Sequence, residues 1–119
     1  GMAQASDAFK ADVKKLLDIS GSNAQMDAAK KQVLAMIPTD KQAEFSKEFE
    51  KSLQPLYQAQ QDFYLKEFTH DDIKQIVKYY ESPIGKKMVE KAKVLNENLT
   101  AITQEWTMEL QGLLMKYQQ

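Results

Sequence analysis

The sequence predicts an all-α protein, a single bundle of five or six antiparallel helices around a long C-terminal helix. Apolar residues recur at intervals of three and four almost throughout, and no stretch alternates like a half-buried strand. Helix start and stop signals divide the chain into segments of helical length. A chain of 119 residues, 43% of them hydrophobic, is also long enough to bury a core of its own.

The first five residues are not expected to belong to the fold. Gly1 ahead of Met2 looks like a residue left by tag cleavage, and Ala3-Gln4-Ala5 has the small-x-small form of a signal-peptidase site. An ordinary flexible N-terminus is the alternative. We therefore assign residues 1–5 to a tag or signal-peptide remnant and residues 6–119 to a single helical domain.

Capping residues predict the first two helices. Ser6 is placed to cap a first helix that ends near Ser20-Gly21, because glycine readily adopts the left-handed terminating conformation. Asn23 is placed to cap a second helix, which Pro38 stops. The expected inward residues are Phe9, Val13, Leu16 and Leu17, followed by Met26, Ala29, Val33, Leu34 and Ile37.

The third helix opens at Thr39 or Asp40, and Thr39 has the capping-box spacing to Gln42. Pro55 lies inside this helix and should kink or break it, because proline removes an amide donor and clashes one turn back. The expected inward face comprises Phe45, Phe49, Leu53, Leu56, Phe63 and Tyr64.

The fourth helix has the clearest start signal in the chain. Thr69 and Asp72 form a capping-box pattern, and Phe68 is placed to staple onto Ile73. The helix ends at Ser82-Pro83, where serine is a good N-cap and proline a good first residue for the helix that follows.

The long C-terminal helix should span about residues 83–117. An apolar row runs along it in steps of three and four, or about 3.6 residues per step, and the helix would be roughly 50 Å long. Either the other helices pack along its whole length, or its C-terminal half binds a partner chain. The expected contact set for a homodimer or a partner protein is Trp106, Leu110, Leu113, Leu114 and Tyr117.

Composition excludes several kinds of site. With no cysteine and one histidine, a single chain cannot build a structural zinc site, an iron–sulfur cluster or a disulfide frame. All 16 basic residues are lysine and the net charge is −1, which argues against a nucleic-acid partner. No cofactor or catalytic constellation is visible, and no apolar run approaches the length of about 20 residues that a transmembrane helix needs.

A few polar residues invite a chemical interpretation. His70 precedes two aspartates, but we expect an exposed residue in a first helical turn. Glu105 and Glu109 lie one turn apart and could share a cation or a proton, but we expect them to form a solvated helix edge. Nine aromatic and methionine residues are expected mainly to form core, with a cavity for an apolar ligand as the alternative; they are Tyr57, Phe63, Tyr64, Phe68, Tyr79, Tyr80, Met88, Trp106 and Met108.

The segment Ser82-Pro83-Ile84-Gly85-Lys86-Lys87 is the most unusual local feature. A helix N-terminus with two lysines could hold an anion. Alternatively the segment is a structural corner, in which Gly85 lets a neighbouring helix or the rings of Tyr79 and Tyr80 approach closely. A glycine there costs about 1 kcal/mol relative to alanine, so a packing or binding reason is expected.

The run Phe68-Thr69-x-x-x-Ile73, followed by Tyr79-Tyr80-x-Ser82-Pro83-x-Gly85-Lys86-Lys87, resembles the pattern of the bacterial family called domain of unknown function 2059. The strong resemblance covers about residues 56–95. It implies an all-helical domain of a protein made with a secretory leader, and hence a periplasmic or secreted location. It implies no activity and no catalytic residue.

Together these observations favour a non-enzymatic periplasmic or secreted protein with an interaction or structural role. A carrier that holds a small apolar or lipid-like ligand between its helices is the alternative. No metal, no cofactor and no catalytic residue is assigned.

Overall fold

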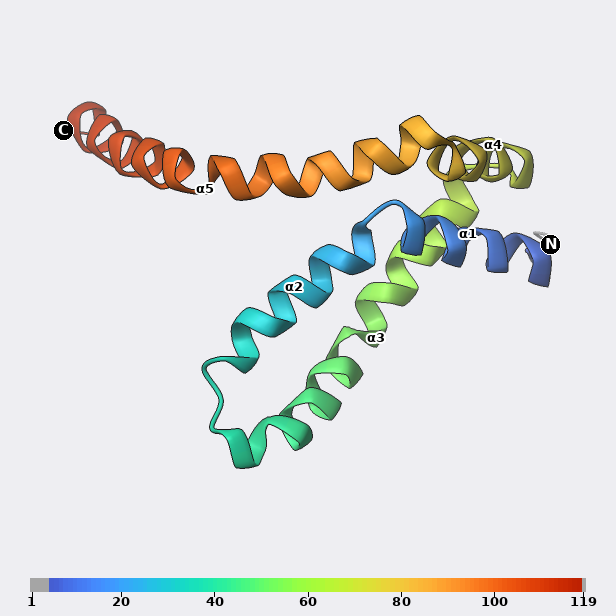
Figure 1. Ribbon diagram of the computed structural model, residues 1–119, viewed down its shortest axis with the longest axis horizontal. Helices are drawn as coiled ribbons and strands as arrows, with labels where there is room; N and C mark the ends of the chain where they lie inside the picture. The colour runs from blue at the N-terminus through green and yellow to red at the C-terminus, as the bar shows by residue number, and fades with distance from the viewer. Residues whose placement is uncertain (1–4, 119) are drawn as a thin grey trace.

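The computed structural model describes residues 5–118, which form five α-helices, one 3₁₀ turn and no strand (Figure 1). The helices are α1 (Asp7–Ile19), α2 (Ser22–Leu34), α3 (Gln42–Glu67), α4 (His70–Glu81) and α5 (Pro83–Tyr117), and the turn η1 (Thr39–Lys41) precedes α3. The predicted all-α class and the long C-terminal helix are confirmed. Most of the predicted N-terminal remnant, including Ala3 and Gln4, lies outside the described residues.

The hydrophobic core lies between α1 and α4, not along α5. Its buried residues are Val13, Leu16 and Leu17 from α1, and Ile73 and Val77 from α4. Partly buried side chains pack around these five; they are Phe9, Ile19, Tyr64, Leu65, Phe68, Ile76 and Tyr80. The helices were expected to surround the C-terminal one, but α5 packs chiefly against α4. The centre of the fold is therefore the crossing of α1 with α4.

The ends of α1 follow the predicted capping residues. The Phe9 amide donates to the Ser6 hydroxyl over 3.1 Å, and Gly21 has a left-handed φ of 91° after the helix. The predicted cap of the next helix is wrong, because α2 begins at Ser22 without a side-chain cap. The Asn23 side chain instead donates to the Asp18 carboxylate, across the turn between the two helices.

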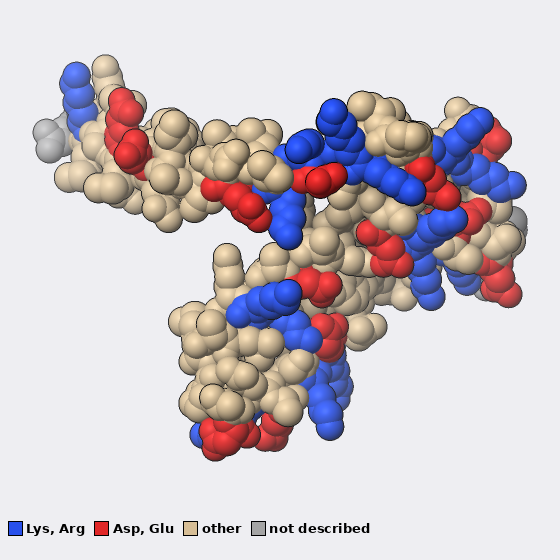
Figure 2. Space-filling model, viewed as in Figure 1, with Lys and Arg blue, Asp and Glu red and all other residues tan. Residues whose placement is uncertain are grey.

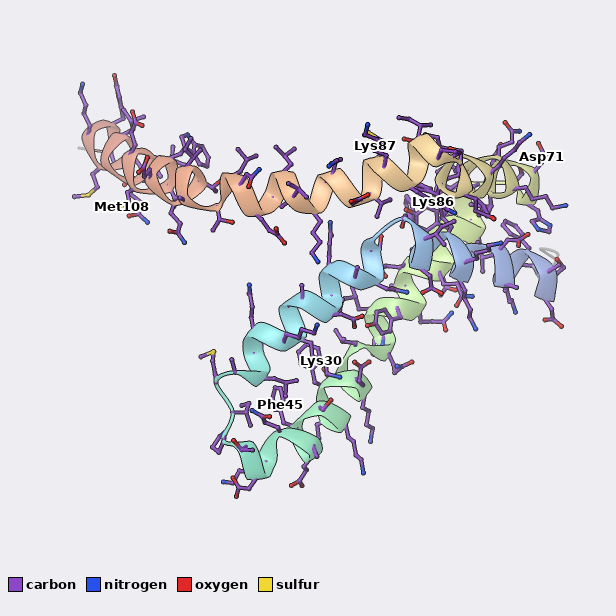
Figure 3. All side chains as sticks on the ribbon, viewed as in Figure 1. Lys30, Phe45, Asp71, Lys86, Lys87 and Met108 are labelled. Atoms are coloured by element: carbon purple, nitrogen blue, oxygen red, sulfur yellow. The ribbon has the colours of Figure 1, made fainter. Side chains whose placement is uncertain are left out.

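Helices α2 and α3 form a hairpin that is thinly packed, since neither helix contains a buried residue. An ion pair of 2.9 Å between Lys30 and Glu50 joins them, and Phe45 lies on the same inner side (Figure 3). The expected capping role of Gln42 is wrong: its amide nitrogen donates to the carbonyls of Leu34 and Ile37, which closes the loop.

Pro55 does not break the third helix: α3 is a single helix from Gln42 to Glu67, with Pro55 inside it. Its expected inward face is only partly correct. Phe45, Phe49, Leu53 and Tyr64 are half-buried, but Leu56 and Phe63 are exposed. Helix α3 packs mainly against α1 and α2, so part of its apolar face contacts no other helix.

The hairpin gives a pH-dependent contribution to stability through Tyr57. Partial burial, then the nearby carboxylates of Glu50 and Asp27, raise the pKa of Tyr57 above its ordinary value of 10.0, and Lys30 partly opposes them. Folding therefore favours the neutral phenol. This contribution is complete below the ordinary pKa and is lost as the pH rises through the folded pKa.

We expect the α2–α3 hairpin to lose stability as the pH rises above the ordinary tyrosine pKa of 10.0, through ionisation of Tyr57. Urea unfolding at a series of pH values measures this, and Tyr57→Phe should flatten the decline relative to wild type. Tyr117→Phe is the matched control, because Tyr117 is 77% exposed. Parallel stability curves for wild type and Tyr57→Phe would contradict the assignment.

The start of α4 has the full capping box that the sequence predicts. The Asp72 amide donates to the Thr69 hydroxyl over 3.1 Å, and the Thr69 amide donates to the Asp72 carboxylate over 2.9 Å. Phe68, just before the cap, packs against the cluster that contains Ile73. These local bonds fix where α4 begins and so place its buried residues against α1.

Replacing Thr69 with alanine should lower the free energy of unfolding by about 1 kcal/mol, within a range of about 0.5–2, because one helical amide loses its acceptor. Chemical denaturation followed by circular dichroism measures the change. Thr107→Ala is the control: the Thr107 hydroxyl donates to a carbonyl within α5 and caps nothing. Equal effects of the two substitutions would refute the capping role.

Helix α5 extends away from the other helices, and its C-terminal half has no neighbour in Figure 1. The Cα radius of gyration is 19.1 Å, whereas a compact chain of this length would have about 13.5 Å. The accessible surface is 9752 Å², compared with roughly 6,600 Å² for a compact monomer of this mass. About 3,000 Å² of surface is therefore exposed that a compact monomer would bury.

None of the helices in the described residues is both long enough and apolar enough to span a lipid bilayer.

Candidate functional site

The corner between α4 and α5 is built on Ser82. Its hydroxyl accepts from the Gly85 amide over 3.1 Å and donates to the Tyr79 carbonyl, so it caps both helix ends at once. Its backbone amide also donates to the carbonyls of Lys78 and Tyr79. Pro83 follows as the first residue of α5, where its missing amide costs nothing.

Gly85 is buried in this corner because the backbone of α4 lies directly against it. A Cβ atom on Gly85 would lie 1.9 Å from the Tyr79 carbonyl oxygen and 2.7 Å from the Tyr80 Cα. The close neighbour is therefore the backbone of α4, which confirms the expected approach of a neighbouring helix; the tyrosine rings are not the contact. The glycine sets the angle at which α5 leaves α4.

The two lysines of the corner, Lys86 and Lys87, are exposed at the start of α5 (Figure 3). An anion at this helix N-terminus would need free amides, but the Gly85 amide is already bonded to Ser82. Helix capping explains why Ser82 and Pro83 occur at this corner, and close backbone packing explains Gly85; none of the three requires a bound anion.

Three of the aromatic residues expected around a cavity, Tyr64, Phe68 and Tyr80, line one surface hollow, but the rest of that set lies elsewhere. The Tyr79 and Tyr80 rings meet edge to face at 5.1 Å, with Tyr79 exposed and Tyr80 against the core. Phe68 stacks on Tyr64 with ring centroids 5.5 Å apart. Trp106 projects into solvent from α5. The predicted aromatic and methionine set is therefore divided between the core, the outer part of α3 and α5.

His70 joins α4 to α1, and the expectation of an exposed residue is wrong. Its Nε2 lies 2.6 Å from the Asp12 carboxylate, and its ring stacks on Phe9 with centroids 5.0 Å apart. The His70 side chain is 28% exposed. No pattern in the sequence predicts this pair, because Asp12 and His70 are far apart in the chain. Such a pair locks two helices together and requires no catalytic explanation.

Two hollows lie on the surface of the helical body. The larger, about 490 Å³, is open and mostly charged; it is lined by Asp12, Lys15, Lys74, Val77, Lys78, Glu81 and Ser82. The smaller, about 290 Å³, is lined by Leu16, Ser20, Ser22, Tyr64, Phe68, Ile76 and Tyr80. No group of three His, Asp or Glu side chains is placed to hold a metal ion among residues 5–118.

A row of apolar residues runs along α5, and we call it the α5 stripe. It comprises Met88, Ala92, Leu95, Leu99, Ile102, Trp106, Leu110, Leu113 and Tyr117. Steps of three and four residues keep these side chains on one face of the helix. From Lys91 to Gln118 every residue is exposed except Leu110, which is half-buried. Figure 2 shows this half of α5 as largely uncharged surface.

The predicted contact residues on α5 are solvent-facing in the structure. Trp106 is 58% exposed and Tyr117 is 77% exposed, Leu113 and Leu114 are about half exposed, and Leu110 is half-buried. The sequence analysis left Leu95, Leu99 and Ile102 out of this set, although all three are exposed. They belong to the same stripe, but only the structure shows that no other helix covers them.

Comparison of the sequence with protein-family models shows the family of this chain. The family model described as an uncharacterized protein conserved in bacteria, DUF2059, matches residues 47–112, more than half of the sequence. The chain belongs to the DUF2059 family. The match is longer than the resemblance over residues 56–95 that the sequence analysis described. The DUF2059 region covers most of α3, all of α4 and α5 as far as Gly112, and it leaves out α1 and α2.

No curated protein and no solved structure matches the chain. Within the DUF2059 region, the described structure has a tightly packed corner followed by the uncovered α5 stripe. The most prominent surface of the family region is therefore an apolar helix face.

Proposed function

We propose that this DUF2059 protein is a non-enzymatic interaction module of the bacterial cell envelope, and that α5 is its protein-binding surface. One observation carries the proposal: the α5 stripe continues for almost the whole helix, and the other described residues leave most of it uncovered. Exposed apolar patches of several hundred Å² on a folded protein mark interaction surfaces.

The small core supports the same proposal. Apart from Gly85, the buried residues in the described part of the chain are the five of the core, all of them in α1 and α4, so α5 receives little stabilisation from its own chain. In proteins most of the stability of a helix comes from the packing of its apolar face rather than from intrinsic helix propensity. Covering the α5 stripe with another protein would supply the missing burial, at about 25 cal/mol for each Å² removed from water.

The envelope location rests on the family resemblance, which implies a secretory leader, and on the Ala3-Gln4-Ala5 stub. Fractionation of cells that produce the natural gene product tests it. Recovery of the protein with periplasmic markers is expected, and recovery with cytoplasmic markers would contradict it.

Cross-linking in living cells tests the binding surface. A photoreactive phenylalanine analogue at Trp106 should form a cross-link to another polypeptide chain. The matched control is the same analogue at Met108, which is more exposed but lies about 200° around the helix from Trp106. Cross-links at both positions, or at neither, would contradict the proposal.

A second candidate is a carrier of a small apolar ligand, and the 290 Å³ hollow favours it. Leu16, Phe68 and Ile76 give this hollow apolar walls, and tyrosine and serine hydroxyls could fix an orientation. Displacement of the fluorescent probe N-phenyl-1-naphthylamine by fatty acids tests it, with Ile76→Trp as the variant that fills the hollow. Equal probe binding by wild type and variant would dismiss the carrier.

A further inference from the structure

We propose that the partner of α5 is a second copy of this chain, with the two α5 helices antiparallel around a two-fold axis near residue 97. This inference rests on the proposed function, because it names the partner that the α5 stripe binds. Three features of the described chain support it: the exposed area, the order of apolar residues, and the charges along the edge of the stripe.

The exposed area fits a pair of equal chains. The surface in excess of a compact monomer is about 3,000 Å², and a stable interface buries about 800 Å² on each partner. A two-fold axis presents the same patch from both chains, so one apolar stripe is enough to build the whole interface. No additional surface of a different kind is needed.

The order of apolar residues favours the antiparallel direction. From Met88 to Trp106 the steps are four, three, four, three and four, the alternation of a helix pair packed knobs into holes. With the axis near residue 97, Met88 lies opposite the partner's Trp106, and Leu95 opposite the partner's Leu99. Ala92, the small member of the stripe, then meets the partner's Ile102.

These contacts match large side chains with flexible or small ones. A methionine thioether packs favourably against an aromatic ring, and an alanine leaves room for a branched side chain. A parallel pair in register would instead set Trp106 against its own copy, and Ala92 against its own copy. The first arrangement is crowded and the second leaves a gap.

Charges along one edge of the stripe point to the same arrangement. Lys91, Asn98 and Glu105 follow one another at intervals of seven residues, so they share one flank of the helix. In the antiparallel pair Lys91 lies beside the partner's Glu105, and this contact occurs twice. Asn98 meets its own copy at the axis. In a parallel pair the residues opposite Lys91 and Glu105 would carry no charge.

Both charged groups are available for such contacts. Lys91 and Glu105 are exposed, and neither takes part in any ion pair within residues 5–118. The antiparallel direction also keeps the two α1–α4 cores at opposite ends of the pair, since α5 runs outward from its own core (Figure 1).

Complementary charge reversal tests the inference on the purified full chain by sedimentation equilibrium at low salt, where surface ion pairs are least screened. Lys91→Glu alone and Glu105→Lys alone should each weaken self-association by about tenfold or more, because two attractive contacts become repulsive. An equimolar mixture of the two variants should associate like wild type, because both contacts are attractive again in the mixed pair.

A distance measurement checks the direction independently. The chain has no cysteine, so single spin labels can be placed at Glu97→Cys and, separately, at Gln111→Cys, both outside the stripe. In the antiparallel pair the two labels at residue 97 lie at the same level, whereas those at residue 111 are about 40 Å apart along the axis. A parallel pair would give short distances at both positions.

Restored association in the mixture, with a short distance at residue 97 and a long one at residue 111, supports the inference. A dimer with short distances at both positions overturns the antiparallel arrangement. A monomer at every concentration overturns the second copy as partner. In that case a cross-link from Trp106 in cells would leave the proposed function standing, and its absence would remove the proposed function as well.

Discussion

Replacing Gly85 with alanine is expected to lower the free energy of unfolding by about 3 kcal/mol, at the upper end of the cost of forcing extra volume into a packed site. The new Cβ would lie 1.9 Å from the Tyr79 carbonyl oxygen and 2.7 Å from the Tyr80 Cα. These are backbone atoms of α4, so no side-chain rotation relieves the overlap. The angle between α4 and α5 must open, which breaks the Ser82 cap.

Gly112→Ala is the matched control for this substitution. It makes the same chemical change in the same helix, but a Cβ on Gly112 would meet nothing within 4 Å. Because alanine is the better helix former, Gly112→Ala should stabilise the protein by up to about 1 kcal/mol. Urea unfolding of both variants measures the two effects. A stable Gly85→Ala protein would show that the corner does not depend on close backbone contact.

Replacing Ile102 with lysine is expected to abolish association through the α5 stripe. Ile102 is 63% exposed in the single chain, so the substitution should leave the α1–α4 core intact. In the proposed pair it removes two buried side chains, each worth about 1.5–3 kcal/mol, and so weakens association by at least about a hundredfold. Light scattering against concentration gives the mass of the associating species.

Met108→Lys controls for the added charge. Met108 is 72% exposed and lies on the other side of α5 from the stripe, so its replacement should leave association unchanged. Far-ultraviolet circular dichroism should show the same helix content for both variants. If Ile102→Lys associates like wild type, the α5 stripe is not the interface.

Local signals in the sequence predicted the helix boundaries well. Ser6, Thr69 and Ser82 each cap a helix as expected, because a cap depends on residues three positions apart. The errors at Asn23 and Gln42 have a local cause too. Each side chain bonds to the preceding helix instead of its own, which residue type alone does not reveal.

The packing of the helices was less predictable from the sequence. The pair of His70 with Asp12 depends on how α1 crosses α4, and no periodicity encodes that crossing. The apolar face of α5 was evident, but its exposure was not, because a covered face and an uncovered one have the same spacing. Gly85 was correctly singled out as a packing position, although its neighbour proved to be backbone.

Hydrogen exchange along α5 tests most directly whether a second copy covers the stripe. In the purified protein at high concentration, the amides around Leu99 and Trp106 should exchange as slowly as those of Val13 and Ile73 in the core, since helix opening would require separation of the pair. Dilution or Ile102→Lys should remove this protection. Rapid exchange around Leu99 at every concentration, beside a protected α1–α4 core, would contradict the second copy on α5.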